Sequence, residues 1–419
     1  MINVKQKELV ELVLQTRREN SMKLFDELKW RGMIQDVSSP EVEKMINDGN
    51  VTFYWGTDPT ADSLHIGHYT NLVLARNFKK HGHNPILLVG GATALIGDPR
   101  GKGERPLMSR EDIAHNFDKI SAQVSGITGC EIVNNYDWIK DIDVISFLRD
   151  YGKHFTVNYM LDKDKVKRQL ENGLSFTEFS YMLLQALDFK HLYETRGVTL
   201  QIAGSDQWGN ITSGIELIRR TLGKEAYGMT MPLVLDENGN KIGKSEGNAV
   251  WLDKEKFSSY KMYQYLINTA DSVVIDHLKK MTLLEPSVIE ELETKLKEKP
   301  ELREAQKALA FEVVKDVHGI DEANEAKRIS EEVFTMGYSE EGMEEETIEL
   351  TDGMNILDLL VQVKIAPSKS EARRLVTGNG ISINSEKVTD VNLLITEDMF
   401  NDKFIVSKGK KTHIKVNLK

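Results

Sequence analysis

Two polar segments of this chain have the residue types and spacing to bind phosphate groups. In residues 59–68 (PTADSLHIGH), His65 and His68 lie three positions apart, on one face of the first turn of a predicted helix. The free N–H groups and positive dipole end of a helix start favour phosphate oxygens, and Gly67 leaves a nucleotide room to approach. The second segment, residues 241–245 (KIGKS), lies in a Gly/Asn-rich loop. Helix capping alone would explain the histidines and solvation the lysines, but together the segments indicate ATP held between a helix start and a mobile basic loop.

The elements that must position these segments alternate between short apolar runs and helical patterns. Four apolar runs predict the strands of a parallel sheet covered by helices on both faces. They span residues 51–58, 84–91, 131–137 and 199–206. Ligands of such sheets bind beyond the carboxyl ends of the strands, where Asp58, Asp98, Asp206 and Gln207 are found. Asp206 could equally be the N-cap of the helix that follows it.

We expect four regions along the chain. They are an α/β domain at 1–240 with a helical insertion at about 105–195, a lysine loop and all-α domain at 241–335, an acidic linker at 336–353, and a small α+β domain at 354–419. In the last region, Ser368 is placed to cap a short helix that Gly378 ends, and ISINSEKV predicts a hairpin.

The formal net charge of −11 argues against non-specific nucleic-acid binding, but the charge is unevenly distributed. Residues 354–419 hold eleven Lys/Arg and seven Asp/Glu, a net charge of +4, so the rest of the chain carries −15. A basic module on an acidic body suits a protein of which one end contacts a polyanion. The single cysteine, Cys130, excludes an intramolecular disulfide and a multi-cysteine metal site, and we expect no bound metal. No segment resembles a signal peptide or a membrane span, so we predict a cytoplasmic protein without membrane contact.

Several other classes of enzyme are excluded by their motifs. The segment GGATALIGD (90–98) does not fit G-x-G-x-x-G, and a P-loop would need glycine where Asn238 stands. The NGN at 238–240 predicts a hairpin turn instead. The zinc motif HExxH does not occur.

Five blocks resemble bacterial and organellar tyrosyl-tRNA synthetases, in the order that this family shows. They are YWGTDPTADSLHIGH, GGATALIGDPRG, SFTEFSYMLLQALDF, GSDQWGN and KIGKS. The resemblance runs from about Leu24 to the C-terminus, and HIGH and KMSKS are the signatures of class I aminoacyl-tRNA synthetases. It implies a Rossmann-like parallel sheet with a helical insertion, an all-α anticodon-binding domain and an α+β RNA-binding domain of the S-four type. It also implies a homodimer with tRNA lying across both subunits. Trp55 and Thr57 depart from the usual YCGFDPT, and KIGKS departs from KMSKS but keeps both lysines.

The activity that the resemblance implies is that of a tyrosine–tRNA ligase. Such an enzyme joins L-tyrosine to AMP from ATP, bound as its magnesium complex, and then transfers the tyrosyl group to the 3′ end of tRNA(Tyr). The reaction needs positioning and charge stabilisation but no covalent enzyme intermediate. His65 and His68, with Thr60, are placed to stabilise the phosphates from one side. Lys241 and Lys244 can close over the leaving pyrophosphate from the other.

The resemblance also assigns the other residues of the two substrate sites. Those for ATP are Gly56, Asp58, Gly67, Gly204, Asp206 and Lys244, with Gly204 and Asp206 at the ribose. Those for tyrosine are Asp98, Tyr181 and Gln185 at the ammonium group, Tyr54 and Asp188 at the hydroxyl, and Gln207. Tyr181, Gln185 and Asp188 are spaced i, i+4 and i+7 on one helix face, a spacing that an amphipathic core helix would also explain.

The basic tail supplies candidates for contacts with RNA phosphates, although an ordinary solvated surface is the alternative. These candidates are Lys369, Arg373, Arg374, Lys408, Lys410 and Lys411. Other functions stay open. A tryptophanyl-tRNA synthetase would present an indole N–H to Asp188, a nucleotidyltransferase would share HxGH, and an RNA-binding or splicing factor could be built on a synthetase scaffold.

Overall fold

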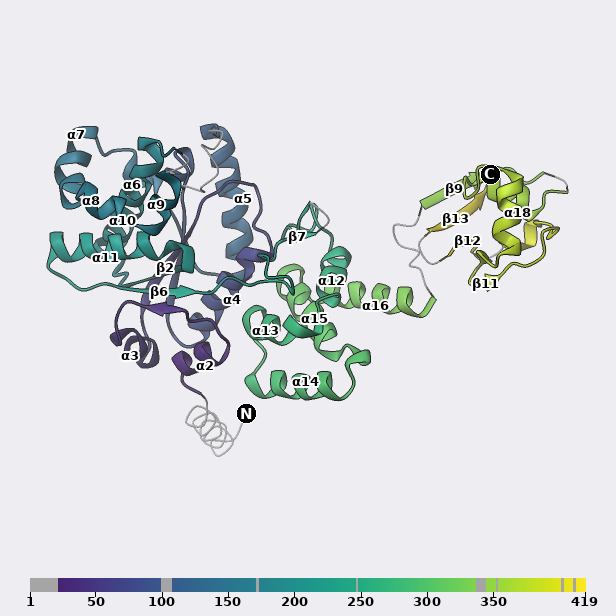
Figure 1. The fold of residues 1–419 in the computed structure, drawn as a ribbon, viewed down its shortest axis with the longest axis horizontal. Coiled ribbons are helices and arrows are strands. Elements are labelled where there is room, and N and C mark those ends of the chain that lie inside the picture. Colours follow the sequence, from purple (N-terminus) through teal and green to yellow (C-terminus); the bar gives the residue numbers. More distant parts are fainter. Residues whose placement is uncertain are drawn as a thin grey trace, which may run out of the picture. The chain divides into compact units, whose positions relative to one another are not determined.

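Figure 1 shows the fold of the chain as a computed structural model. The structure describes residues 22–98, 108–170, 173–245, 248–336, 344–351, 353–400, 403–409 and 412–419. Contacts divide the chain into two units, Met1–His318 and Gly319–Lys419, and each is described by itself.

The first unit is built around a six-stranded sheet. Its strands are β1 (Asp36–Val37), β2 (Thr52–Thr57), β3 (Asn84–Val89), β4 (Glu131–Asn134), β5 (Leu200–Gly204) and β6 (Tyr227–Met231), in the order β1-β6-β5-β2-β3-β4. Strands β2 to β6 are parallel, and β1 adds an antiparallel edge. The four predicted strands are confirmed. Strands β6 and β1 were not predicted, because YGMTM is short and poor in β-branched residues and β1 has only two residues.

The strand order creates a reversal next to β2. The chain proceeds from β2 outward to β3 and β4, then returns to place β5 and β6 on the other side of β2. Ligands of open parallel sheets bind at such a switch point, outside the carboxyl ends of the strands. The fold therefore places a site at the ends of β2 and β5, where Asp58 and Asp206 were predicted to act.

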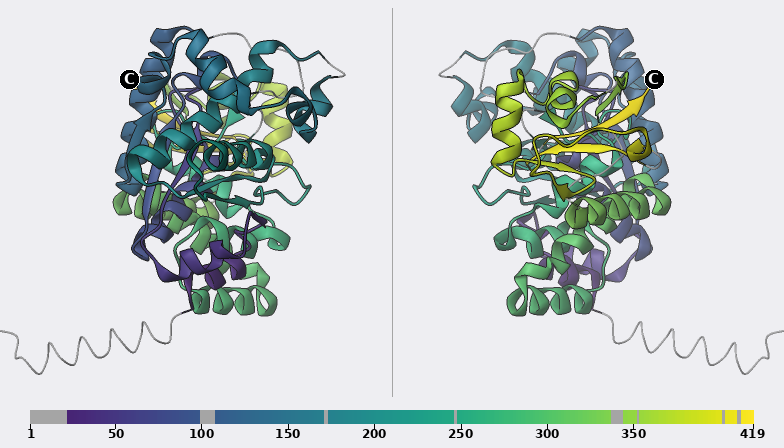
Figure 2. Two further views of the ribbon diagram at one scale, coloured as in Figure 1. Left: turned by 90° about the vertical axis from the view of Figure 1, so that its left-hand side faces the viewer. Right: turned by 90° about the vertical axis from the view of Figure 1, so that its right-hand side faces the viewer.

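Helices cover both faces of this sheet (Figures 1 and 2). The longest are α4 (Ile66–Lys80), α5 (Arg110–Thr128), α10 (Phe176–Arg196) and α11 (Trp208–Leu222). Strand β2 alternates its side chains between the faces: Phe53 packs on Phe78 of α4 with ring centroids 4.6 Å apart, whereas Tyr54 packs on Phe189 of α10 at 5.5 Å. Trp55 shares the face of Phe53 and is 5% exposed, so the unusual indole is a core side chain.

The helical insertion is shorter than predicted. Because β4 pairs with β3, residues 131–134 belong to the main sheet. The helical insertion between β4 and β5 therefore begins after residue 134. It contains α6 (Tyr136–Ile139), α7 (Val144–Ser146), a π turn (Phe147–Tyr151), a 3-10 turn (Gly152–His154), α8 (Val157–Leu161) and α9 (Asp164–Leu170). Helix α10 follows, and it begins at a capping box formed by Ser175 and Glu178.

The remainder of the first unit is helical, as the sequence predicts. It comprises α2 (Leu24–Trp30) and α3 (Glu41–Asp48) before the sheet, and α12 (Ser259–Ile267), α13 (Asp271–Met281), α14 (Pro286–Glu298) and α15 (Glu304–His318) after it. Arg31 is 2% exposed and joins the two groups, because its guanidinium donates hydrogen bonds to the carbonyls of Lys279, Thr282 and Leu284.

The second unit is a helix followed by a small α+β domain. Helix α16 (Ile320–Met336) precedes β9 (Glu344–Ile348), α17 (Ile356–Gln362), α18 (Lys369–Thr377), β10 (Ile381–Ile383), β11 (Glu386–Lys387), β12 (Ile405–Lys408) and β13 (Thr412–Leu418). The strands form one sheet in the order β11-β10-β12-β13-β9. The predicted hairpin is confirmed as β10 and β11, and Ser368 and Gly378 cap α18 as expected.

The predicted linker at 336–353 needs correction, because strand β9 lies inside it. Despite its three glutamates, β9 pairs in parallel with β13 along five residues. Lys415 on β13 donates to Glu345 at 3.0 Å, and Lys364 donates to Glu346 at 2.8 Å. The acidic residues therefore form one edge strand of the domain. Among the described residues, no helix is long and apolar enough to cross a membrane.

Candidate active site

The two histidines of the first segment cap helix α4. His65 is the N-cap: its Nδ1 accepts a hydrogen bond from the Gly67 N–H at 3.0 Å, and His68 Nδ1 accepts one from the His65 N–H at 3.3 Å. Capping is thus confirmed, and it also fixes the chemistry of the rings. Because each Nδ1 accepts, each neutral imidazole carries its proton on Nε2. The ring centroids are 4.0 Å apart, so the two imidazoles lie next to each other at the start of the helix.

The electrostatics of the site favour a neutral His68 ring. Burial, with a smaller contribution from His65, lowers the pKa of His68 to about 3. His68 is therefore uncharged at physiological pH and acts as a neutral hydrogen-bond donor. Together with the backbone N–H groups of the first turn, such donors suit the oxygens of a phosphate chain.

The lysine segment forms a hairpin. Strands β7 (Lys244–Ser245) and β8 (Asn248–Ala249) pair antiparallel, and Leu235 forms an isolated bridge with Lys241 ahead of them. The Asp236 N–H donates to the Asn240 carbonyl at 2.8 Å, so the turn predicted at 238–240 is confirmed. Lys241 is exposed, and the side chain of Lys244 lies outside the described part of the structure.

This hairpin packs on the start of α4. The Ile66 N–H donates to the Val250 carbonyl at 2.8 Å, and the Leu252 N–H donates to the Leu64 carbonyl at 2.8 Å. A Cβ on Gly67 would lie 3.0 Å from the Ile242 carbonyl oxygen, so glycine permits this close approach. The two segments that the sequence linked to phosphate are neighbours in space.

Asp58, at the end of β2, connects several elements of the site. Its Oδ1 accepts a hydrogen bond from Thr93 at 2.7 Å, and its Oδ2 accepts one from the Tyr181 hydroxyl at 3.0 Å. Its carbonyl accepts a bond from the Thr60 N–H at 2.8 Å, which leaves the Thr60 side chain exposed near the α4 start. Gly56, two residues earlier, is exposed as well.

A polar network lies beside Asp58. Gln207 Nε2 donates to Asp98 at 3.3 Å, and Asn210 Nδ2 donates to Gln185 Oε1 at 3.0 Å and to Gln207 Oε1 at 2.9 Å. The three residues predicted at a tyrosine ammonium group are thereby gathered around one region with Gln207. Asn210 is an addition that the sequence did not single out.

A cavity of about 260 Å³ opens onto this network. Its lining includes Asp98, Tyr181, Asp206 and Asn210. Asp206 lies in a 3-10 turn (Ser205–Gln207), and α11 has no side-chain cap at its N-terminus, so the N-cap interpretation of Asp206 is wrong. A Cβ on Gly204 would lie 2.9 Å from Asp206 Oδ1, so glycine at this position leaves room for the carboxylate.

The predicted hydroxyl end is deeply buried. Tyr54 is 1% exposed, and its hydroxyl has no hydrogen-bond partner among the described residues. Asp188 is 2% exposed and accepts hydrogen bonds from Asn135 at 3.0 Å and from the Trp138 indole at 2.9 Å. Burial raises the pKa of Asp188 to about 7, although both hydrogen bonds oppose the rise. The Asp188 charge in turn adds to the effect of burial in raising the pKa of Tyr54, as expected for neighbouring groups.

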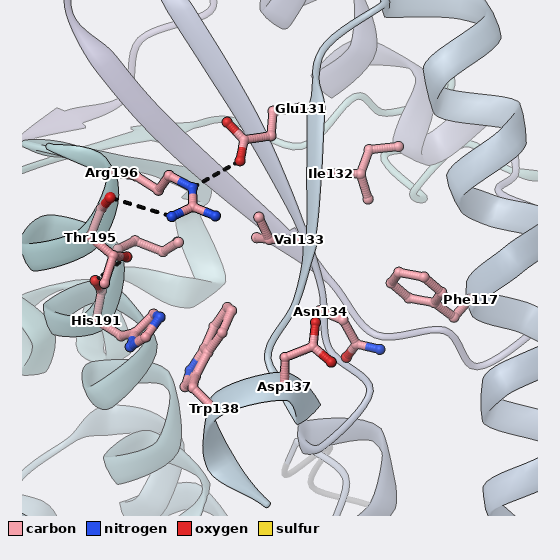
Figure 3. A pocket seen from close by; sticks show the side chains of 11 residues that line it. Phe117, Glu131, Ile132, Val133, Asn134, Asp137, Trp138, His191, Thr195 and Arg196 are labelled. Carbon is pink, nitrogen blue, oxygen red and sulfur yellow. Dashed lines mark hydrogen bonds and ion pairs between the residues drawn. The ribbon is translucent and has the colours of Figure 1, made fainter.

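A second cavity, of about 380 Å³, lies behind this end of the site (Figure 3). Trp138 lines it and stacks on His191, with ring centroids 4.3 Å apart and planes 13° apart. Arg196, on the same helix as His191, donates to Glu131 of β4 at 2.9 Å elsewhere in the lining. The indole therefore separates this cavity from Asp188.

Sequence reasoning missed three residues of the hydroxyl end: Asn135, Trp138 and Gln201. Asn135 and Trp138 follow β4 directly, so the carboxyl-end rule could have identified them in NNYDW. Gln201 is 2% exposed, and its Oε1 has no partner among the described residues. Gln201 lies within a predicted strand, and only its pairing with Tyr54 on β2 shows that it belongs to this end of the site.

Comparison with known proteins identifies the family. Residues 47–335, more than half of the chain, match the family described as "tRNA synthetases class I (W and Y)". The chain belongs to this family. Residues 338–416 match the "Tyrosine--tRNA ligase SYY-like C-terminal domain". The chain is thus an aminoacyl-tRNA synthetase, and the predicted resemblance to tyrosyl-tRNA synthetases is confirmed.

Solved structures of tyrosyl-tRNA synthetases are similar to this chain. A C-terminally truncated mitochondrial enzyme of Aspergillus nidulans has 29% identity and a TM-score of 0.67, covering 78% of this chain and 99% of its own. The corresponding enzyme of Coccidioides posadasii has 28% identity and a TM-score of 0.66, with coverage of 78% and 99%. A complex with L-tyrosine from Archaeoglobus fulgidus, at 18% identity and a TM-score of 0.54 over 73% of this chain and 100% of its own, shares the fold.

The synthetase tail presents part of its predicted basic set. Arg373 and Arg374 are exposed on α18, and Arg374 donates to Glu371 at 3.0 Å. Lys369 pairs with Asp358, and Lys408 donates to the Ile365 carbonyl at 3.3 Å. Lys410 and Lys411 lie outside the described residues.

Proposed function

We propose that this synthetase activates L-tyrosine with ATP and transfers the tyrosyl group to tRNA(Tyr), with the site above as its catalytic centre. The observation that carries the choice of amino acid is the Tyr54 hydroxyl, which is buried next to Asp188 without a partner among the described residues. A buried hydroxyl left unsatisfied costs about 1–3 kcal/mol, and a ligand hydroxyl would satisfy it. The phenol of tyrosine provides a donor for Asp188 and an acceptor for Tyr54.

The other end of the amino acid meets the polar network. Asp98, Tyr181, Gln185 and Gln207 are proposed to hold the tyrosine ammonium group, which requires oxygen acceptors and an anionic charge. Asp58 supports this role because it accepts the Tyr181 hydrogen bond and so fixes the direction of that hydroxyl. A site of this kind rejects phenylalanine, since its own polar groups would stay unpaired; tyrosyl-tRNA synthetases are the standard example of that rejection.

ATP, bound as its magnesium complex, is proposed to lie between α4 and the hairpin. The tyrosine carboxylate attacks the α-phosphate, and the bond to pyrophosphate breaks. His65 and His68, with Thr60, would donate hydrogen bonds to phosphate oxygens, while Lys241 and Lys244 balance the charge of pyrophosphate. The adenylate's ribose would lie beside Gly204 and Asp206, and Gly56, Asp58 and Gly67 would border the nucleotide. No protein-bound metal is required.

The second unit is proposed to hold tRNA. The exposed arginines of α18 support phosphate contacts, and Lys369, Lys408, Lys410 and Lys411 complete the predicted set. The single cysteine is consistent with a cytoplasmic location, which stays a prediction.

A homodimer is also proposed, supported by large apolar side chains that are exposed in the insertion and at the start of α10. Its exposed side chains are Val144, Ile145, Leu148, Val157 and Phe176, with exposed fractions from 50% to 78%. Large apolar side chains of this exposure are candidates for an interaction surface. Sedimentation of the wild type and of Phe176→Asp tests this proposal, and a monomeric wild type would contradict it.

The decisive experiment for the function is ATP–pyrophosphate exchange with single amino acids. We expect exchange with L-tyrosine and none with phenylalanine or tryptophan. Exchange that depends on tryptophan would instead favour the tryptophanyl alternative, and adenylate formation without any amino acid requirement would favour a nucleotidyltransferase. A protein that binds RNA but supports no exchange would be a synthetase-derived RNA-binding factor.

A further inference from the structure

Helix α15 of the helical domain is tied to α4 through one carboxylate. Tyr69 immediately follows His68, is 1% exposed, and donates its hydroxyl to Asp316 Oδ2 at 2.6 Å. Arg76, two turns further along α4, forms an ion pair with Asp316 Oδ1. Asp316 is 16% exposed, so solvent screens this interaction only in part.

The spacing of these contacts restrains α4 in a particular way. Tyr69 and Arg76 are seven residues apart and lie on one face of the helix. Holding both to one carboxylate fixes the rotation of α4 about its axis as well as its distance from α15. A rotation of α4 would carry its first turn, and therefore His65 and His68, away from their positions.

A second set of hydrogen bonds links the end of α15 to the chain just before His65. His318, the last residue of α15, uses Nε2 to donate to the Leu252 carbonyl at 2.8 Å, while its Nδ1 accepts from Ser259 at 2.9 Å. The Leu252 N–H donates in turn to the carbonyl of Leu64, the residue before His65. The end of α15 thus contacts α4 beyond the histidines and, through Leu252, the chain just before them.

We propose that Asp316 is a positioning residue for tyrosyl-adenylate formation, acting through Tyr69 and Arg76 to set the α4 histidines against the ATP phosphates. The tyrosine pocket is built from β2, α10 and the chain after β4, so it does not depend on this contact. The inference rests on the proposed function, because it assumes that His65 and His68 face ATP.

The test uses Asp316→Asn, which keeps an acceptor oxygen for Tyr69 but loses the charge that pairs with Arg76, and Tyr69→Phe, which removes only a hydroxyl. Both should lower kcat of tyrosine-dependent exchange by about tenfold and raise KM for ATP, since a distant change that misplaces reacting groups by an ångström can cost about 10²-fold. KM for tyrosine should stay within about twofold of the wild type, because the pocket is separate. The matched control is Glu304→Gln on the same helix, whose exposed carboxylate pairs with Lys307.

The outcomes separate the two proposals. A wild type without tyrosine-dependent exchange would overturn the proposed function itself. If the wild type is active and Asp316→Asn behaves like Glu304→Gln, the positioning role is refuted. A lower melting temperature with unchanged kcat and KM in folded enzyme also refutes it, because a merely structural contact would give that result. Should Asp316→Asn fail to fold, Tyr69→Phe decides alone.

Discussion

Tyr54 and Gln201 are paired residues on the neighbouring parallel strands β2 and β5, and each carries a buried oxygen without a hydrogen-bond partner among the described residues. The two residues are direct neighbours across the strands, and Tyr54 is close enough to Asp188 for that carboxylate to raise the pKa of its hydroxyl. In proteins, buried polar atoms are nearly always satisfied, so this pair marks a place that a ligand or water must complete.

The first prediction concerns Tyr54→Phe. Removing an unsatisfied hydroxyl should leave the free energy of unfolding unchanged or raise it by about 1 kcal/mol. The same change should raise KM for tyrosine by about tenfold, because one hydrogen bond to the substrate hydroxyl is lost. Urea unfolding and pyrophosphate exchange measure the two effects, and Tyr193→Phe, at the edge of the same apolar cluster, is the control. A destabilised variant with normal KM would contradict the assignment.

The second prediction concerns pH and Asp188, whose pKa burial raises to about 7. The folded protein keeps a proton on this carboxyl between about pH 4 and pH 7, whereas the unfolded chain has lost it. Stability must therefore fall as pH rises through that interval, by about 4 kcal/mol from a shift of about three pKa units. Asp188→Asn should show less of this loss when melting is followed from pH 4 to pH 8.

Tyrosine binding should have the opposite pH dependence, because it is favoured by the ionised form of Asp188. The ionised carboxylate is the stronger acceptor for a phenol hydroxyl, so kcat/KM for tyrosine should rise between pH 6 and pH 8 in the wild type. In Asp188→Asn the profile should be low and flat over this interval. A variant that keeps the wild-type pH profile would show that another group titrates.

A third prediction follows from the neutral His68. Because burial lowers its pKa to about 3, the folded state excludes a proton that the unfolded chain binds below about pH 6.5. Its contribution opposes folding increasingly as pH falls from about 6.5 towards 3, and His68→Asn should reduce this acid sensitivity. Asparagine can still accept the His65 N–H, whereas His68→Ala loses that half of the capping box; the hydrogen bond from the Gly67 N–H to His65 is present in both variants. Exchange should fall by about 10²-fold in His68→Ala and by less in His68→Asn.

The fourth prediction concerns truncation. A chain ending at Met336 should keep tyrosine-dependent exchange and lose most tRNA charging, because the first unit holds the whole candidate site. A chain ending at Gly353 should retain exchange but be more prone to aggregate, since it leaves β9 without its partner β13. Aminoacylation assays and light scattering distinguish the two. Equal charging by the shorter chain and the full chain would refute the tRNA role of the second unit.

The sequence predicted the main framework because apolar runs and helical periods are local signals. Four strands and the helical block after the hairpin follow from them, and so does the position of Asp58 and Asp206 at strand ends. Asp188 was identified only by resemblance, since its helix spacing also fits a core helix. Its bonds to Asn135 and Trp138 join residues that are 53 and 50 positions apart along the chain.

Other features could not be predicted because they too depend on contacts between residues that are distant in sequence. Trp55 departs from the usual pattern of the family, and only the structure shows that the alternation of β2 places it on the same face as Phe53, in the core. The glutamates of β9 made the segment resemble a linker. Their charge is offset by Lys415 and Lys364, which are distant in sequence, so no local pattern could have indicated a strand. In both cases the partner strand or helix decides the environment of the side chain.

The pairing of β9 with β13 has a consequence for how this domain is made. Glu345 and Lys415 are 70 positions apart, and every other strand of the sheet is synthesised between them. On the ribosome, β9 must therefore emerge long before the strand that completes its hydrogen bonds. The glutamates of β9 keep this unpaired segment hydrated and disfavour its pairing with other nascent chains. The same acidic residues that make the segment resemble a linker therefore protect it from aggregation during translation.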